Sequence, residues 1–169
     1  MRVLKPGRHA LPDAVRRAPV EPGEKVLAGV LAEDGTVVVG TRDALYVDGQ
    51  RVPWETVEKA DWSQDDGTLT VSEVGSWGER RPVHTIAVGE PGLFLQLVRE
   101  RVTASVVLQR HVPVRGRKGV FVIARRAPRG DQPITWVYEF EDGVDPDDPE
   151  VRRVAEEALT LAHDEVGLG

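Results

Sequence analysis

The chain has 169 residues, no cysteine and a formal net charge of −6, which excludes disulfide bonds and thiolate metal sites and argues against a general nucleic-acid binder. No stretch approaches the roughly 20 apolar residues that span a bilayer. Residues 1–10 contain three basic residues but no apolar run, so no secretory signal is expected.

The composition predicts a folded, soluble protein. Hydrophobic residues make up 40% of the chain, too much for a disordered chain and, at this length, enough to bury a core. The basic residues are nearly all arginine, and alanine, valine, glycine and aspartate are frequent, as is typical of GC-rich bacterial genomes. Together with the lack of cysteine, this favours a cytoplasmic bacterial protein.

Residues 1–23 read as a lead-in segment. Pro12, Pro19 and Pro22 limit any helix there to one turn, over residues 13–17. We expect this segment to lie on the surface of the core.

Short strands are predicted between residues 25 and 88. Two Asp-Gly pairs, Asp34-Gly35 and Asp48-Gly49, stand between apolar runs and are strong hairpin signals. The expected strands cover residues 25–32, 36–41, 44–47, 51–54, 56–62, 68–74 and 82–88. Such spacing is typical of small antiparallel sheets rolled on themselves.

One of these strands, residues 56–62, alternates strictly. The alternation places Val57 on the same side as Lys59 and Asp61, because successive side chains of a strand point to opposite faces.

The pattern then changes to a helical period. Over residues 90–102, apolar side chains recur every three to five positions, which predicts an amphipathic helix with Pro91 in its first turn.

Three more strands and a helix are predicted beyond residue 103. The strands cover residues 105–112, 119–124 and 134–140, and residues 115–119 form a turn between the first two. Asp147 or Asp148 can cap the final helix, and Pro149 suits its first position.

The first part of the chain resembles the pleckstrin-homology-like domains of bacteria. In that family a short strand ends in an aromatic residue, and an apolar-Pro-Trp segment leads into the next strand. The residues that carry the resemblance are Thr41, Leu45, Tyr46, Val52, Pro53, Trp54, Val57 and Trp62. The resemblance covers about residues 20–103. It implies a rolled antiparallel sheet of about seven strands, capped by a helix.

The expected fold class is therefore mainly β (α+β), in three parts. Residues 1–23 are the lead-in, residues 24–103 the pleckstrin-homology-like roll, and residues 104–169 an extension of strands and a C-terminal helix packed on it.

The resemblance implies binding of lipid headgroups, peptides or proteins more often than catalysis. Members that bind phosphoinositides use basic residues in the loop after the first strand. Here that loop, residues 33–35, is acidic, and its carboxylates would repel phosphate.

The most unusual local feature is a segregation of charge. Residues 139–150 hold seven acids and no base. Residues 109–130 hold seven cations and no acid, namely Arg110, Arg115, Arg117, Lys118, Arg125, Arg126 and Arg129. These cations could bind an anion or an acidic partner, since arginine pairs bidentately with phosphate and carboxylate. Alternatively, the hairpin lies beside the acidic turn of the same molecule or of a second copy, and the charges neutralise each other.

No local motif indicates catalysis. The sequence has no nucleophile elbow, phosphate-binding loop or dinucleotide fingerprint, and no histidine pair at zinc-ligand spacing. The acidic run 142–150 lacks the order of a calcium loop, and a helix cap explains it better. We expect no enzyme, no cofactor, no metal and no specific nucleic-acid partner.

The leading hypothesis is a non-catalytic protein-interaction module, with residues 105–127 and the terminal helix contacting a protein partner or forming a homodimer. One alternative is peripheral binding to an anionic membrane or a phosphate ligand through the arginine-rich hairpin. The other is an enzyme whose residues converge from distant strands, which the sequence alone does not exclude.

Overall fold

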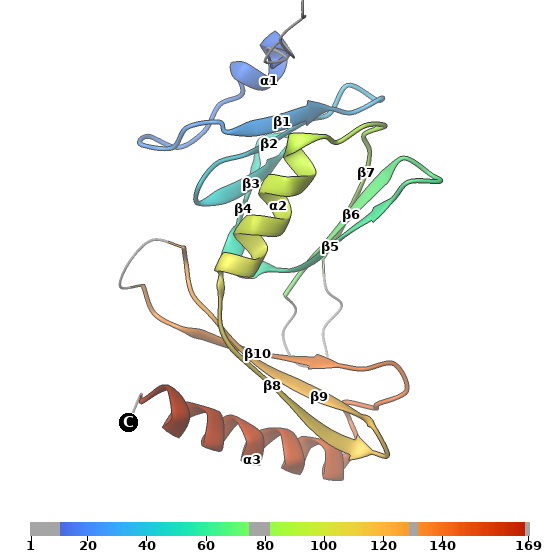
Figure 1. Ribbon diagram of the computed structural model, residues 1–169, viewed down its shortest axis with the longest axis vertical. Helices are drawn as coiled ribbons and strands as arrows, with labels where there is room; N and C mark the ends of the chain where they lie inside the picture. Colours follow the sequence, from blue (N-terminus) through green and yellow to red (C-terminus); the bar gives the residue numbers. More distant parts are fainter. Residues whose placement is uncertain (1–10, 75–81, 129–131, 168–169) are drawn as a thin grey trace, which may run out of the picture.

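The computed structural model describes residues 11–74, 82–128 and 132–167 and is mostly β, with three antiparallel sheets and a C-terminal helix (Figure 1). Its elements are α1 (Asp13–Arg16), β1 (Ala28–Leu31), β2 (Val37–Gly40), β3 (Ala44–Val47), β4 (Gln50–Pro53), a 3₁₀ turn η1 (Trp54–Thr56), β5 (Val57–Ser63), β6 (Thr68–Glu73), β7 (Val83–Ala87), α2 (Leu93–Ala104), β8 (Val106–Arg115), β9 (Lys118–Arg125), β10 (Thr135–Phe140) and α3 (Pro149–Val166). The α+β class predicted from the sequence is confirmed at this level.

The first sheet has the strand order β1-β2-β3-β4. Both predicted Asp-Gly turns connect neighbouring antiparallel strands. In the second turn Asp48 and Gly49 have φ angles of 50° and 83°. A two-residue turn with φ positive at both positions matches the twist of the flanking strands, which is why Asp-Gly forms it.

The second sheet has the order β5-β6-β7. The backbone N–H of Glu33, just after β1, donates to the carbonyl of Ala87 at the end of β7 over 3.1 Å, so the two sheets meet there. A bulge between Val57 and Lys59 buries Val57 and Glu58 together. The predicted grouping of Val57 with the exposed Lys59 is therefore wrong, because an extra residue breaks the alternation.

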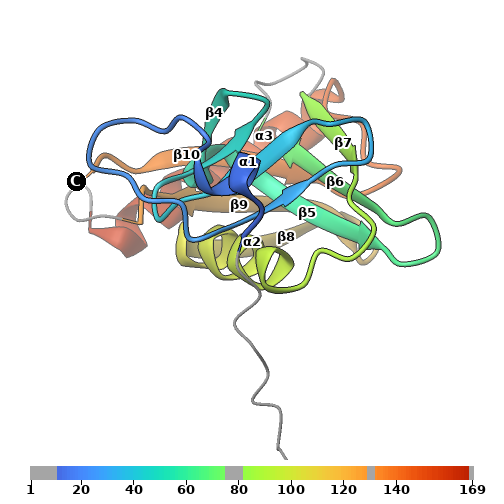
Figure 2. The same cartoon turned by 90° about the horizontal axis from the view of Figure 1, so that it is seen from above.

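Helix α2 packs against β1, β2 and β5 and lies beside both sheets (Figures 1 and 2). Its Phe94 and Val98 share one buried cluster with Trp54 of η1 and Leu69 of β6. Pro91 precedes the helix instead of lying in its first turn, and the Pro91 carbonyl accepts from the Phe94 N–H over 3.0 Å. None of the helices in the described ranges is long and apolar enough to cross a membrane.

The third sheet, with the order β10-β9-β8, is separate from the first two. Helix α3 covers the face that points away from them (Figure 1). On that face Val122 packs with Ala158 and Ala162 of α3. Asp148 caps the helix by accepting the Glu150 N–H over 2.9 Å, and Pro149 is its first residue, as predicted.

Candidate functional site

The first candidate surface is the arginine-rich β8–β9 hairpin, and its cations are paired within the molecule. Arg110 makes a bidentate contact with Glu165 of α3. Arg115 donates to Asp148 over 2.7 Å, and the Lys118 ammonium donates to the Asp142 carbonyl over 3.2 Å. The Arg115–Asp148 contact agrees with the second sequence interpretation, in which the hairpin and the acidic turn neutralise each other, whereas Arg110 pairs with an acid of α3 outside that turn. Such exposed pairs contribute about 0–1 kcal/mol each.

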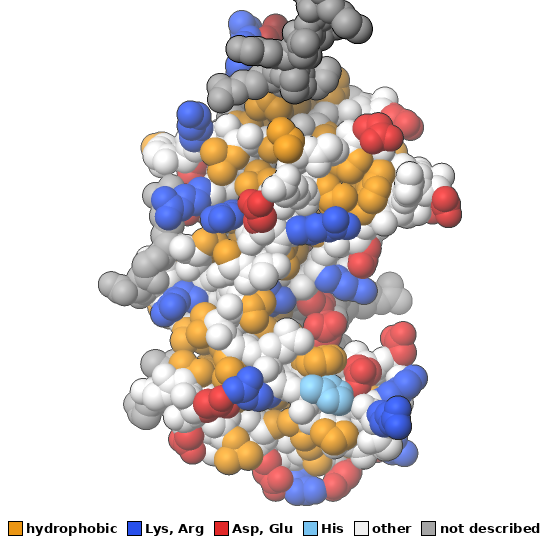
Figure 3. All heavy atoms as spheres, in the orientation of Figure 1, with side chains coloured by type: hydrophobic (Ala, Val, Ile, Leu, Met, Phe, Trp, Pro, Cys, Tyr) orange, Lys and Arg blue, Asp and Glu red, His pale blue; other side chains and the backbone are white. Residues whose placement is uncertain are grey.

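The other predicted cations do not extend one surface. Arg117 is exposed at the hairpin turn, whereas Arg126 is half-buried, and Arg129 lies outside the described residues. On the face seen in Figure 3, basic and acidic side chains are interspersed over the part formed by the third sheet and α3.

Arg125 is buried between the third sheet and the second. Its side chain donates to the Ser105 hydroxyl over 3.1 Å and to the Glu58 carbonyl of β5 over 3.0 Å, and only 3% of the residue is exposed. Burial lowers the pKa of Arg125, and the charges of Glu58 and Glu139 partly offset that effect. Arg125 therefore joins two sheets instead of facing a ligand.

The acidic turn also has a structural role. The Glu141 carboxylate accepts the Gly119 N–H over 2.6 Å and lies 2.8 Å from the His111 ring nitrogen. Its hydrogen bonds with His111 and Gly119 lower the pKa of Glu141. In the described part of the chain, no group of three or more acidic or histidine residues could hold a metal ion.

The second candidate surface lies where the lead-in segment meets the first sheet. A buried carboxylate directly after the lead-in, Glu24, holds the two together. Glu24, whose side chain is 6% exposed, accepts hydrogen bonds from Thr41 over 2.6 Å, Tyr46 over 2.7 Å and Arg51 over 3.1 Å. Burial alone would raise the pKa of Glu24, but these three hydrogen bonds outweigh it and lower the pKa. We call this cluster the Glu24 latch.

Two of the residues that suggested the family resemblance, Thr41 and Tyr46, belong to this latch. The Trp54 indole donates to the Thr41 carbonyl over 2.9 Å. The Tyr46 hydroxyl bonds both Glu24 and the Glu21 N–H. Thr41 and Tyr46 therefore hold residues 21–24 against the sheet, on the side opposite α2, whereas Trp54 packs with α2.

Helix α1 packs closely on β1 because position 29 is glycine. A Cβ atom there would lie 2.6 Å from Val15 Cγ1 and 2.7 Å from the Val38 carbonyl oxygen. Val15 is fully buried with Val39, Ala44 and Tyr46. As expected, the described part of the lead-in, residues 11–23, lies on the core through α1.

We expect Gly29→Ala to displace α1 and destabilise the protein by about 1–3 kcal/mol, the usual cost of overpacking. Urea unfolding followed by circular dichroism would measure the change. The control is Ala14→Gly, on the exposed side of α1, which should change the free energy of unfolding less than Gly29→Ala does. Gly116→Ala is unsuitable as a control, because φ at that position is positive. A Gly29→Ala protein as stable as the wild type would contradict the packing argument.

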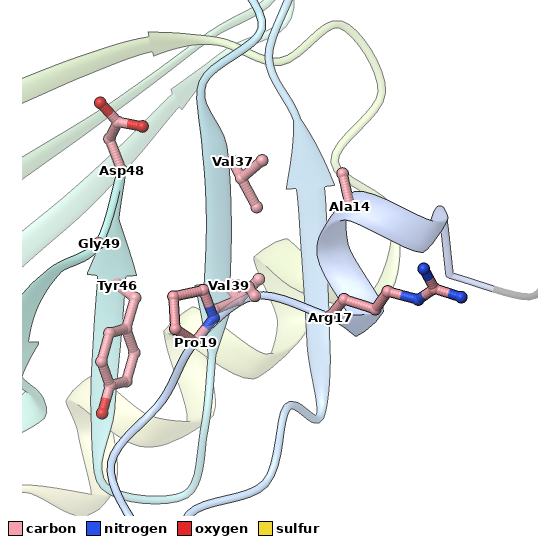
Figure 4. Close-up of a pocket in the computed structure, with 9 residues that line it drawn as sticks. Ala14, Arg17, Pro19, Val37, Val39, Tyr46, Asp48 and Gly49 are labelled. Atoms are coloured by element: carbon pink, nitrogen blue, oxygen red, sulfur yellow. The ribbon is translucent and has the colours of Figure 1, made fainter.

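Between the lead-in segment and the first sheet lies an open groove of about 440 Å³ (Figure 4). Its walls are mainly apolar, with Pro19 beside Val39 and Tyr46 in the close-up. The lining residues are Ala14, Arg17, Ala18, Pro19, Val37, Val39, Tyr46, Asp48 and Gly49.

No pattern in the sequence predicts this groove. Its residues come from the lead-in, β2, β3 and the turn after β3, so no local pattern links them. The one available signal was a lead-in with apolar residues between prolines, which had to cover part of a sheet face.

Comparison of the chain with protein-family models, with curated proteins and with solved structures finds no match.

Proposed function

We propose that the chain is a non-catalytic protein-interaction module of the bacterial cytoplasm, built on a pleckstrin-homology-like roll over about residues 24–103. Two observations support the family proposal: sheets of four and three antiparallel strands meet beside α2, and Thr41, Tyr46 and Trp54 are linked through the Glu24 latch. Residues 104–169 extend the roll with a sheet and a helix of their own.

The observation that carries the interaction proposal is the groove. Its lining is mostly apolar, as expected where apolar side chains of a protein partner dock. Three of its lining residues are titratable, Arg17, Tyr46 and Asp48, and the Tyr46 hydroxyl is already bonded to Glu24. This lining suits binding better than proton transfer or nucleophilic chemistry.

The arginine-rich hairpin gives weaker support to binding an anionic membrane or a phosphate ligand. Arg110, Arg115 and Lys118 already contact acidic residues or carbonyls of the same chain. An anion would have to displace these contacts.

A displayed random-peptide library selected on the full chain would test the groove. We expect enriched peptides to carry apolar residues and to lose at least about tenfold in affinity, or about 1.4 kcal/mol, on Ala14→Trp, which fills the groove from α1. Ala104→Trp, an exposed alanine at the end of α2, is the matched control and should bind like the wild type. Absence of enriched peptides, or equal binding to both variants, would count against the proposal.

A further inference from the structure

We infer that the groove is occupied by a second copy of the chain, related by a two-fold axis; this inference rests on the proposed function of the groove. In a two-fold dimer each copy offers the same patch, so the patch must be complementary to itself. The groove face meets this requirement in its shape and in its charge.

The complementary shape consists of an exposed leucine beside the hollow. Leu31 is paired in register with Val37, which lines the groove. Directly paired residues of antiparallel strands project on the same face, so the Leu31 side chain stands on the groove face. Helix α1 packs over Gly29, two residues earlier on that face, and Leu31 is 47% exposed.

A two-fold axis between these features places Leu31 of each copy in the groove of the other. The dimer is then a closed assembly, because both leucines and both grooves are occupied and no further copy can add. This contact would remove the exposed Leu31 side chain and the apolar lining of the groove from water together.

The complementary charge consists of one cation and one anion on opposite sides of the groove. Figure 4 shows the Arg17 and Asp48 side chains pointing away from each other at its two ends. Both residues are exposed. Within the described residues, Arg17 and Asp48 form no salt bridge with each other. The same two-fold axis brings Arg17 of one copy toward Asp48 of the other, twice per dimer.

Each of these rim pairs adds little affinity, but together they set the orientation and exclude misaligned contacts. An interface limited to the groove, Leu31 and two rim pairs would be small, and small interfaces are typically weak and reversible. We therefore expect a dimer that dissociates on dilution.

Sedimentation velocity of the full chain over a dilution series up to about 1 mM, the weak end of specific affinity, tests the inference. The wild type should dimerise, and Leu31→Ser should abolish the dimer. Arg17→Glu and Asp48→Lys, each measured alone, should weaken it at least about tenfold, because each homodimer then opposes like charges at two places.

An equimolar mixture of Arg17→Glu and Asp48→Lys should restore the dimer, because a heterodimer has opposite charges at both contacts. This recovery also shows that both variants fold, which matters for Asp48 because φ is positive there. A monomeric wild type, a dimer indifferent to these changes, or a mixture without recovery would overturn the inference. If the wild type is monomeric while selected peptides still bind the groove, the interaction proposal stands and only the second copy is wrong.

Discussion

Replacing Arg125 with alanine is expected to lower the free energy of unfolding by about 3 kcal/mol, the usual cost of removing one member of a buried charged group. The Glu58 carbonyl and the Ser105 hydroxyl would each lose a charged donor. The buried Glu58, whose charge raises the pKa of Arg125, would also lose that cation. Urea unfolding followed by tryptophan fluorescence would measure the loss.

The neighbouring Arg126 provides the matched control. It follows Arg125 directly, is half-buried and has its backbone N–H bonded to the Ser105 carbonyl, a bond that alanine keeps. Arg126→Ala should therefore stay within about 0.5 kcal/mol of the wild type. Arg125→Lys should lie between the two, since one ammonium does not reproduce the guanidinium fork. Equal effects of the two alanine variants would refute a special role for Arg125.

The second large effect is expected at Glu24. Glu24→Ala removes the acceptor shared by Thr41, Tyr46 and Arg51 and should destabilise the protein by about 3 kcal/mol, as hydrogen bonds to a buried charge are worth about 1.5–3 kcal/mol. Glu21→Ala is the control, because Glu21 is 65% exposed and lies 3.9 Å from Arg51. If both variants unfold at the same urea concentration, the latch contributes nothing of its own.

The latch also predicts a pH dependence with a definite sign. The folded state lowers the pKa of Glu24 below its ordinary value of 4.5, so the ionised carboxylate stabilises the fold fully above that value. This contribution is lost as the pH falls through the lowered pKa. Glu24→Gln should be less stable than the wild type at neutral pH, and the difference should shrink in acid. A difference in unfolding free energy that stays constant with pH would contradict this account.

Local patterns predicted most elements well, because turns and caps act over a few residues. The Asp48-Gly49 turn follows from the positive φ that these residues tolerate, and α3 begins where Asp148 and Pro149 place it. The predictions of where α2 begins and of which side of its strand Val57 occupies were wrong. Gly92 and the bulge near Glu58 decide those features, and bulges depend on how a partner strand pairs.

The sequence by itself determined the strand-rich class, the hairpin turns, the final helix and the opposite charges of residues 109–130 and 139–150, because each of these depends on neighbours along the chain. Only the tertiary structure decided that Arg110 pairs with α3 and Arg115 with its cap Asp148, that Arg125 is buried against β5, and that Val37 and Pro19 face a common hollow. Those outcomes depend on which side chains of distant segments meet and on how far each side chain is exposed to water. Neighbouring residues along the chain determine neither.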